Sequence, residues 1–141
     1  MSSNSSVSKI YTIYKLQICV ISINIFTLIC IEFKKISENN FEFKSKVQNF
    51  NLNSAGISHG GYIAAILDNG MGSAAHKVIN DGKKCVTISL DIKFIGSSKE
   101  NDILIGKVNI TKKTKTLVFV KAELFQAENI IATASGIWKI I

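Results

Sequence analysis

The chain has 141 residues, enough for one domain that folds around its own hydrophobic core. Hydrophobic residues make up 47% of it and charged residues 19%, which excludes an intrinsically disordered chain. Three cysteines without paired spacing (Cys19, Cys30 and Cys85) exclude a disulfide scaffold and a zinc ribbon. Since His59 and His76 are the only histidines, the sequence predicts no metal site.

All 17 basic residues are lysines, and 10 acidic residues leave a formal net charge of +7. Proteins that bind nucleic acids usually rely on arginine forks and stacked aromatic rings, so the composition favours no nucleic-acid partner. The lysines are spread along the chain, apart from a small cluster at Lys112, Lys113 and Lys115. The abundance of Ile, Asn and Lys, together with the absence of Arg and Pro, indicates that a biased nucleotide composition of the source genome explains the lysine excess. The alternative is a basic face that attracts an anionic ligand.

Residues 1–36 differ in composition from the rest of the chain. A serine-rich start precedes an apolar run, Leu16–Ile31, whose sixteen residues are fewer than the ~20 that span a bilayer as a helix. No small-residue cleavage site follows the run. A targeting or anchoring segment, an extra structural element and a poorly ordered extension all stay open for residues 1–36. We expect the folded domain to comprise residues 37–141, and membrane contact through residues 16–31 is the less favoured alternative.

The remaining residues predict a strand, a long helix and four further strands. Phe41–Val47 alternates apolar and polar residues, as a strand does. A helix then begins near His59, with Ser58 as its expected N-cap, and carries apolar residues every three or four positions to Val78. The four further strands are expected at Cys85–Ile95, Asp102–Thr111, Thr116–Gln126 and Ile130–Ile141.

The pattern of the first of these four strands places Thr87 and Ser89 on one face, opposite Val86 and Ile88. One helix cannot cover both faces of such a sheet. We therefore expect the sheet to wrap around the helix, and its outer face to pair with another subunit.

One motif stands out, Asn53-x-x-Gly56-x-x-His59-Gly60-Gly61, with Asp68 on the helix that follows. A carboxylate on a buried helix is costly unless it is paired or functional, although Asp68 could also belong to an exposed polar stripe with Asn69. The two glycines fit either a tight turn or a close approach of a ligand to free N–H groups at the helix start. His59 is interpreted as a structural residue near that start.

This order of elements and this motif resemble the hotdog-fold acyl-CoA thioesterases, in particular the phenylacetate-pathway and thioesterase superfamily member two types. The strand Val86–Ile95 and the hairpin Lys112–Phe119 are also similar to that family. The resemblance covers about residues 40–141 and implies an α+β hotdog fold, an antiparallel sheet wrapped around one long helix. It further implies hydrolysis of an acyl-CoA in fatty acid metabolism, with no cofactor, in the cytoplasm or an organelle lumen.

The resemblance implies a role for several residues. Asp68 would activate water or attack the thioester carbon, and Gly60 would polarise the thioester carbonyl. Asn53 would hold the water or the carbonyl, and His59 would support that loop. Thr87 would assist from the neighbouring strand, with Ser89 as the alternative. Coenzyme A contacts are implied at Gly61, Ser89, Phe94, Lys99, Lys112, Lys113, Lys115 and Leu117.

Gly60 and Asp68 are eight residues apart, or about 12 Å along one helix. One thioester carbonyl cannot reach both on a single chain, so these roles require a homodimer or a dimer of dimers (a homotetramer). Three alternatives stay open: a hydratase or dehydratase of acyl thioesters, a non-catalytic acyl-CoA-binding protein, and a membrane-tethered interaction protein.

Overall fold

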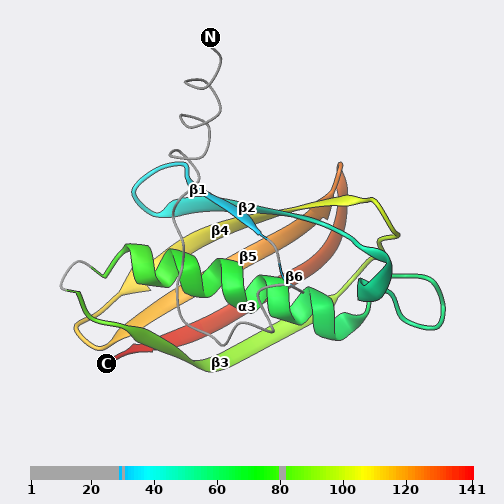
Figure 1. The fold of residues 1–141 in the computed structure, drawn as a ribbon. Helices are drawn as coiled ribbons and strands as arrows, with labels where there is room; N and C mark the ends of the chain where they lie inside the picture. Colours follow the sequence, from blue (N-terminus) through cyan, green and yellow to red (C-terminus); the bar gives the residue numbers. More distant parts are fainter. Residues whose placement is uncertain (1–28, 30, 80–81) are drawn as a thin grey trace, which may run out of the picture.

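The computed structural model describes Ile29 and residues 31–79 and 82–141. The helix and the strands that the sequence predicts all form, with boundaries that differ by a few residues, and one further strand precedes them (Figure 1). In chain order the elements are β1 (Glu32–Lys35), β2 (Asn40–Lys46), the 3-10 helix η1 (Asn49–Asn51), α3 (Gly60–Lys77), β3 (Cys85–Phe94), β4 (Ile103–Lys113), β5 (Leu117–Gln126) and β6 (Asn129–Ile140).

The six strands form one antiparallel sheet in the order β1-β2-β4-β5-β6-β3. The sheet curves around α3, which lies along its concave side (Figure 1). This is the α+β hotdog arrangement that the sequence predicts. The alternating pattern of β2, β4 and β5 explains it, because each strand presents one apolar face to the helix.

Strand β1 is not expected from the sequence. Its Phe33 ring stacks on the Phe41 ring of β2, with centroids 5.6 Å apart, and Lys34 forms a salt bridge of 2.8 Å with Glu42. The sheet therefore begins at Glu32, ahead of the expected boundary at residue 37. The expectations for residues 1–28 lie outside the described residues. None of the helices in the described part of the chain is long and apolar enough to cross a membrane.

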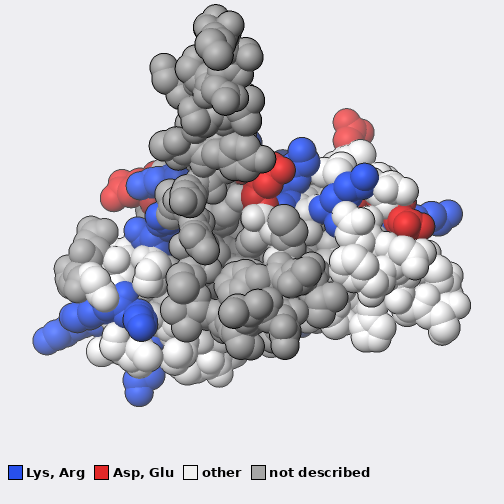
Figure 2. All heavy atoms as spheres, in the orientation of Figure 1, with Lys and Arg blue, Asp and Glu red and all other residues white. Residues whose placement is uncertain are grey.

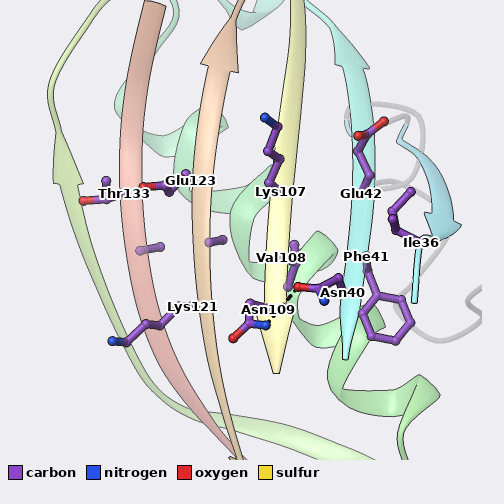
Figure 3. A pocket seen from close by; sticks show the side chains of 12 residues that line it. Ile36, Asn40, Phe41, Glu42, Lys107, Val108, Asn109, Lys121, Glu123 and Thr133 are labelled. Carbon is purple, nitrogen blue, oxygen red and sulfur yellow. Dashed lines mark hydrogen bonds between the residues drawn. The ribbon is translucent and has the colours of Figure 1, made fainter. Parts of the chain in front are cut away.

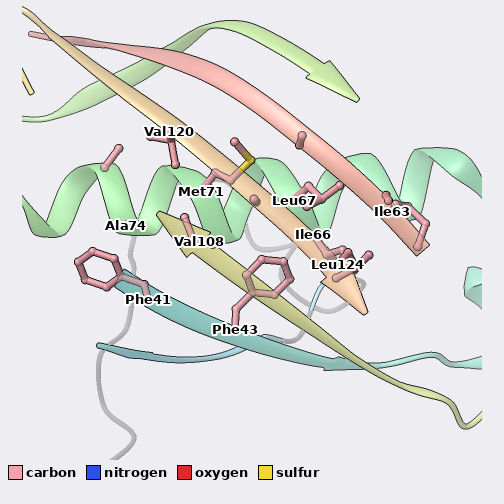
Figure 4. Close-up of a cluster of buried hydrophobic side chains, with 14 of the residues drawn as sticks. Phe41, Phe43, Ile63, Ile66, Leu67, Met71, Ala74, Val108, Val120 and Leu124 are labelled. Carbon is pink, nitrogen blue, oxygen red and sulfur yellow. The ribbon is translucent and has the colours of Figure 1, made fainter. Parts of the chain in front are cut away.

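The core lies between the concave face of the sheet and one face of α3 (Figure 4). Its fully buried side chains include Phe41, Phe43, Ile66, Leu67, Met71, Leu104 and Leu124. The opposite face of α3 is only half-buried, along a stripe made of Ala64, Ala65, Asp68, Asn69 and Gly72. The helix is thus buried on one side, because a single sheet encloses only that side.

The Phe43 ring lies between Gly70 of the helix and Gly106 of the sheet. A Cβ atom at Gly70 of α3 or at Gly106 of β4 would lie 2.1 Å from this ring. Both positions therefore need glycine, since any side chain there would overlap the ring. The three residues fix the distance between α3 and β4, and through it the position of everything that α3 carries.

We predict that Gly70→Ala lowers the free energy of unfolding by about 1–3 kcal/mol through overpacking against Phe43. The sign is diagnostic, because Gly→Ala in an unobstructed helix interior stabilises by up to about 1 kcal/mol. Chemical denaturation measures the change. Combining Gly70→Ala with Phe43→Leu should cost less than the sum of the two single changes. A Gly70→Ala variant more stable than the parent would contradict the packing described above.

Candidate active site

Asp68 and Thr87 form the polar centre of the half-buried side of α3. The Thr87 hydroxyl donates a hydrogen bond of 2.8 Å to the Asp68 Oδ1 atom. Among the described residues, the Asp68 carboxylate has no cationic partner. The second carboxylate oxygen is therefore able to accept a proton or a hydrogen bond from a bound molecule.

A bulge in β3 decides which hydroxyl reaches Asp68. The register of β3 against β6 shifts between Thr87 and Ser89, so Thr87 lies opposite Trp138 on the helix side, whereas Ser89 lies opposite Ile137 on the outer side. The expectation that Thr87 and Ser89 share a face is wrong, because Ile88 is inserted between the paired positions. The bulge also leaves the side chains of Val86 and Ile88 exposed.

His59, rather than the expected Ser58, is the N-cap of α3. The His59 backbone is extended (φ −64°, ψ 135°), and its Nδ1 atom accepts a hydrogen bond of 2.8 Å from the Gly61 N–H. The Ser58 hydroxyl instead bonds the Ser98 hydroxyl at 2.7 Å. With Nδ1 acting as an acceptor, a neutral His59 ring carries its proton on Nε2.

Gly60 contributes a free donor at the start of α3. No described residue accepts a hydrogen bond from its N–H, unlike that of Gly61. A Cβ atom at Gly60 would lie 3.6 Å from the ring of Phe94, so this exposed ring borders the start of the helix. The first turn of a helix concentrates partial positive charge, so this N–H can bind a carbonyl oxygen or an oxyanion.

Asn53 organises its own loop in the structure. Its Oδ1 atom accepts from the Ala55 N–H at 2.9 Å and from the Ile57 N–H at 3.4 Å. The turn also requires Gly56, whose φ of +73° is unfavourable for residues with a side chain. No contact joins Asn53 to Asp68 within the described chain, so the two predicted catalytic residues are not brought together here.

Two residues that the sequence analysis missed support this end of the helix. Buried Asn51 accepts from the Gln48 N–H through Oδ1, and its carbonyl oxygen accepts from the His59 N–H, each at 2.8 Å. Ser98 is buried, and its carbonyl oxygen accepts from the Ser58 N–H at 2.8 Å. Asn51 stands in an asparagine-rich loop and Ser98 is 40 residues from Ser58, so neither has a local sequence signal.

The predicted coenzyme A contacts fall at the two ends of α3. Lys113 donates a hydrogen bond of 2.7 Å to the Val78 carbonyl oxygen at the C-terminal end, beside exposed Lys112 and Lys115 and half-buried Leu117. Figure 2 shows blue side chains gathered at this end of the molecule. Phe94 and Lys99 lie near the other end, about 27 Å away along a helix of 18 residues. The predicted contacts at Gly61 and Ser89 lie at the helix start and on the outer side of β3.

The structure offers little support for a cysteine nucleophile in the described part of the chain. Cys85 is the cysteine present there, and burial raises the pKa of its thiol above the ordinary value, which disfavours the reactive thiolate. The described residues also contain no group of three or more His, Cys, Asp or Glu side chains that could hold a metal ion.

A separate hollow of about 590 Å³ lies on the outer face of the sheet (Figure 3). Outward-pointing charged side chains of both signs form much of its lining, among them Glu42, Lys107, Lys121 and Glu123. None of the predicted site residues borders this hollow, and the sheet separates it from α3. The candidate active site is therefore the half-buried side of α3.

The sequence of this chain is similar to those of known proteins. A family profile described as "Thioesterase superfamily" matches residues 55–132. A Pseudomonas aeruginosa protein named as a putative esterase is 26% identical over 95 residues, which cover 67% of this chain and 71% of that protein.

Solved structures of other proteins show the same fold. The E. coli PaaI protein from the phenylacetic acid degradation operon superposes with a TM-score of 0.76 at 17% identity, over 96% of this chain and 92% of that chain. A hypothetical thioesterase protein from Streptococcus pneumoniae, solved with coenzyme A, gives a TM-score of 0.72 at 22% identity, over 79% of this chain and 86% of that chain. At these identities the likeness shows a shared hotdog fold.

We predict that His59→Ala lowers the free energy of unfolding by about 0.5–2 kcal/mol, because the variant loses the cap on the Gly61 N–H. His59→Asn should recover most of this loss, since asparagine is among the best N-cap residues. Thermal denaturation of both variants measures the difference. If the Asn variant is as unstable as the Ala variant, the stabilising role of His59 is not capping.

Proposed function

This chain belongs to the thioesterase superfamily, and from that premise we propose that it hydrolyses an acyl-CoA to a free acid and coenzyme A. The observation that carries the proposal is the Asp68 carboxylate, which has no cationic partner among the described residues and is held by the Thr87 hydroxyl. Coenzyme A in the structure of the Streptococcus pneumoniae protein supports the choice of a CoA thioester as substrate.

In the proposed reaction, the Asp68 carboxylate removes a proton from a water molecule whose oxygen attacks the thioester carbon. The carbon–sulfur bond then breaks, and the departing thiolate takes up the proton. Attack by the carboxylate itself, followed by hydrolysis of the resulting anhydride, gives the same products. In both routes Thr87 keeps one carboxylate oxygen in place, so the other faces the substrate.

The thioester carbonyl needs a donor that stabilises its developing negative charge, and we assign this role to the Gly60 N–H. Because Gly60 and Asp68 of one chain are about 12 Å apart, the donor would come from Gly60 of the partner subunit. We therefore propose a homodimer with two equivalent sites. Strand β3 supports this assembly, since it lies at the sheet edge and exposes Val86 and Ile88.

Such a dimer would also explain the two groups of coenzyme A contacts. If the two α3 helices run antiparallel, the lysine hairpin of one chain lies near Phe94 and Lys99 of the other. One coenzyme A could then touch both groups, which lie about 27 Å apart within a chain. In this arrangement Lys112 and Lys115 would attract the phosphates, whereas Lys113 holds the C-terminal end of α3.

The hydratase or dehydratase alternative has less support. Such a reaction would use a histidine and a carboxylate together. The His59 Nδ1 atom is engaged by the Gly61 N–H, so one of the two ring nitrogens is not available to a substrate. The non-catalytic binding alternative differs from our proposal in one respect, since binding alone does not require the Asp68 carboxylate.

We predict that Asp68→Asn reduces the rate of acyl-CoA hydrolysis by about 100-fold or more, because the amide can neither accept the proton nor attack the carbonyl. Thiol release from a panel of acyl-CoAs measures the rate. Glu128→Gln in the exposed β5–β6 turn is the matched control and should retain full activity. Hydrolysis close to the parent rate by the Asn variant would favour the binding-protein alternative.

The lysine hairpin generates a second prediction. Replacing Lys112 and Lys115 by Ala should raise KM several-fold, leave kcat nearly unchanged and flatten the salt dependence of kcat/KM, because exposed charges act over about one Debye length, ~8 Å at physiological ionic strength. Lys113→Ala should instead lower thermal stability, since its amine bonds the Val78 carbonyl. An unchanged KM for the double variant at low and high salt would exclude phosphate binding by these lysines.

A further inference from the structure

Trp138 carries a hydrogen-bond donor that no described residue uses. The side chain lies on the helix side of β6 and is only 2% exposed, yet its indole N–H takes part in no hydrogen bond among the described residues. Every described side-chain nitrogen or oxygen that is sealed from solvent has a partner, so the indole nitrogen, which has none, keeps some contact with solvent. A buried tryptophan N–H normally finds an acceptor, which makes this one notable.

Two glycines fix the direction of this donor. A Cβ atom at Gly136 would lie 2.6 and 2.8 Å from two carbons of the six-membered indole ring, so that ring lies flat over the strand. A Cβ atom at Gly72 of α3 would lie 3.1 Å from the indole nitrogen. The nitrogen therefore points at the helix backbone, and glycine at position 72 leaves it uncovered.

The uncovered nitrogen belongs to the candidate active site. Gly72 follows Asp68 by four residues, which places it on the same face of α3, about 6 Å further along the axis. Thr87, whose hydroxyl binds Asp68, lies directly opposite Trp138 in the pairing of β3 with β6. The carboxylate and the indole N–H thus border the same half-buried side of the helix, one turn apart.

We propose that the Trp138 indole N–H binds an oxygen on the acyl group of the substrate, two or three carbons beyond the thioester carbonyl. This inference deepens the proposed thioesterase function and rests on it. The thioester carbonyl oxygen cannot serve as the acceptor, because the donor lies one helix turn from Asp68. A neutral N–H suits a hydroxyl or keto oxygen, and the substrate class is therefore an oxygenated acyl-CoA.

The same donor should discriminate against plain acyl groups. A hydrocarbon chain placed beside Gly72 would remove water from the indole N–H without offering an acceptor in its place. A donor left unpaired in this way costs more than the hydrogen bond itself contributes, so sites of this kind reject analogues that lack the oxygen.

Hydrolysis of matched substrates tests the proposal. We expect kcat/KM for 3-hydroxybutanoyl-CoA or 4-hydroxybutanoyl-CoA to exceed that for butanoyl-CoA by about tenfold. This ratio corresponds to one hydrogen bond that the hydroxylated substrate forms and butanoyl-CoA does not. Thiol release measures the rates. Trp138→Phe should bring this ratio close to one, because the variant has no indole N–H to pair or to leave unpaired. Equal rates for all three substrates in the parent protein, or an undiminished ratio in the variant, would overturn it.

Gly72→Ala keeps the proposal testable if Trp138→Phe fails to fold. The added methyl group covers the indole nitrogen, and alanine favours the helix, so the variant should fold and lose the preference. If a folded Gly72→Ala variant still prefers the hydroxybutanoyl-CoA over butanoyl-CoA, the Trp138 indole N–H is not the group that binds the acyl oxygen.

Direct binding separates this inference from the proposed function. Trp138 is the only tryptophan in the chain, so its fluorescence reports on its own surroundings. In the Asp68→Asn variant, the hydroxybutanoyl-CoA that is preferred should shift the emission and bind several-fold more tightly than butanoyl-CoA. If the parent protein hydrolyses none of a broad panel of acyl-CoAs, the proposed function fails, and the same titration still decides whether Trp138 recognises the oxygen.

Discussion

A single sheet can bury only one face of a helix, and the rest of this structure depends on that constraint. The Phe43 ring, with room made by Gly70 and Gly106, sets how closely α3 approaches the sheet. The apolar face of the helix is thereby enclosed, and the other face is left half-buried with Asp68 on it. The carboxylate is therefore not sealed in the core, yet Thr87 of the neighbouring strand still fixes its orientation.

One inserted residue in β3 determines which polar side chains of the sheet face that carboxylate. A bulge at Ile88 turns Thr87 toward the helix and Ser89 away from it, since a shift of one residue exchanges the two faces of a strand. The same register sets Trp138 beside Thr87. The position of the bulge therefore selects both the hydroxyl that holds the carboxylate and the aromatic donor one helix turn away.

The two ends of α3 serve different purposes. At its N-terminus His59 satisfies the Gly61 N–H, whereas no described residue accepts a hydrogen bond from the Gly60 N–H. At its C-terminus Lys113 satisfies the Val78 carbonyl, and a cation there also complements the helix dipole. Part of the positive charge of the chain is therefore structural, so the net charge by itself does not report on substrate binding.

Local patterns in the sequence were sufficient to predict the helix, five strands and the wrapping of the sheet around the helix. They also placed the Asp68 carboxylate on that helix, because periodicity and motif spacing are properties of neighbouring residues. Tertiary structure decided what depends on distant partners. Strand β1 pairs with β2, where Phe33 stacks on Phe41, and the helix is capped by His59 while Ser58 bonds Ser98. The bulge in β3 and the uncovered indole nitrogen likewise arise only when separate elements meet, since each is defined by a residue on another strand or helix.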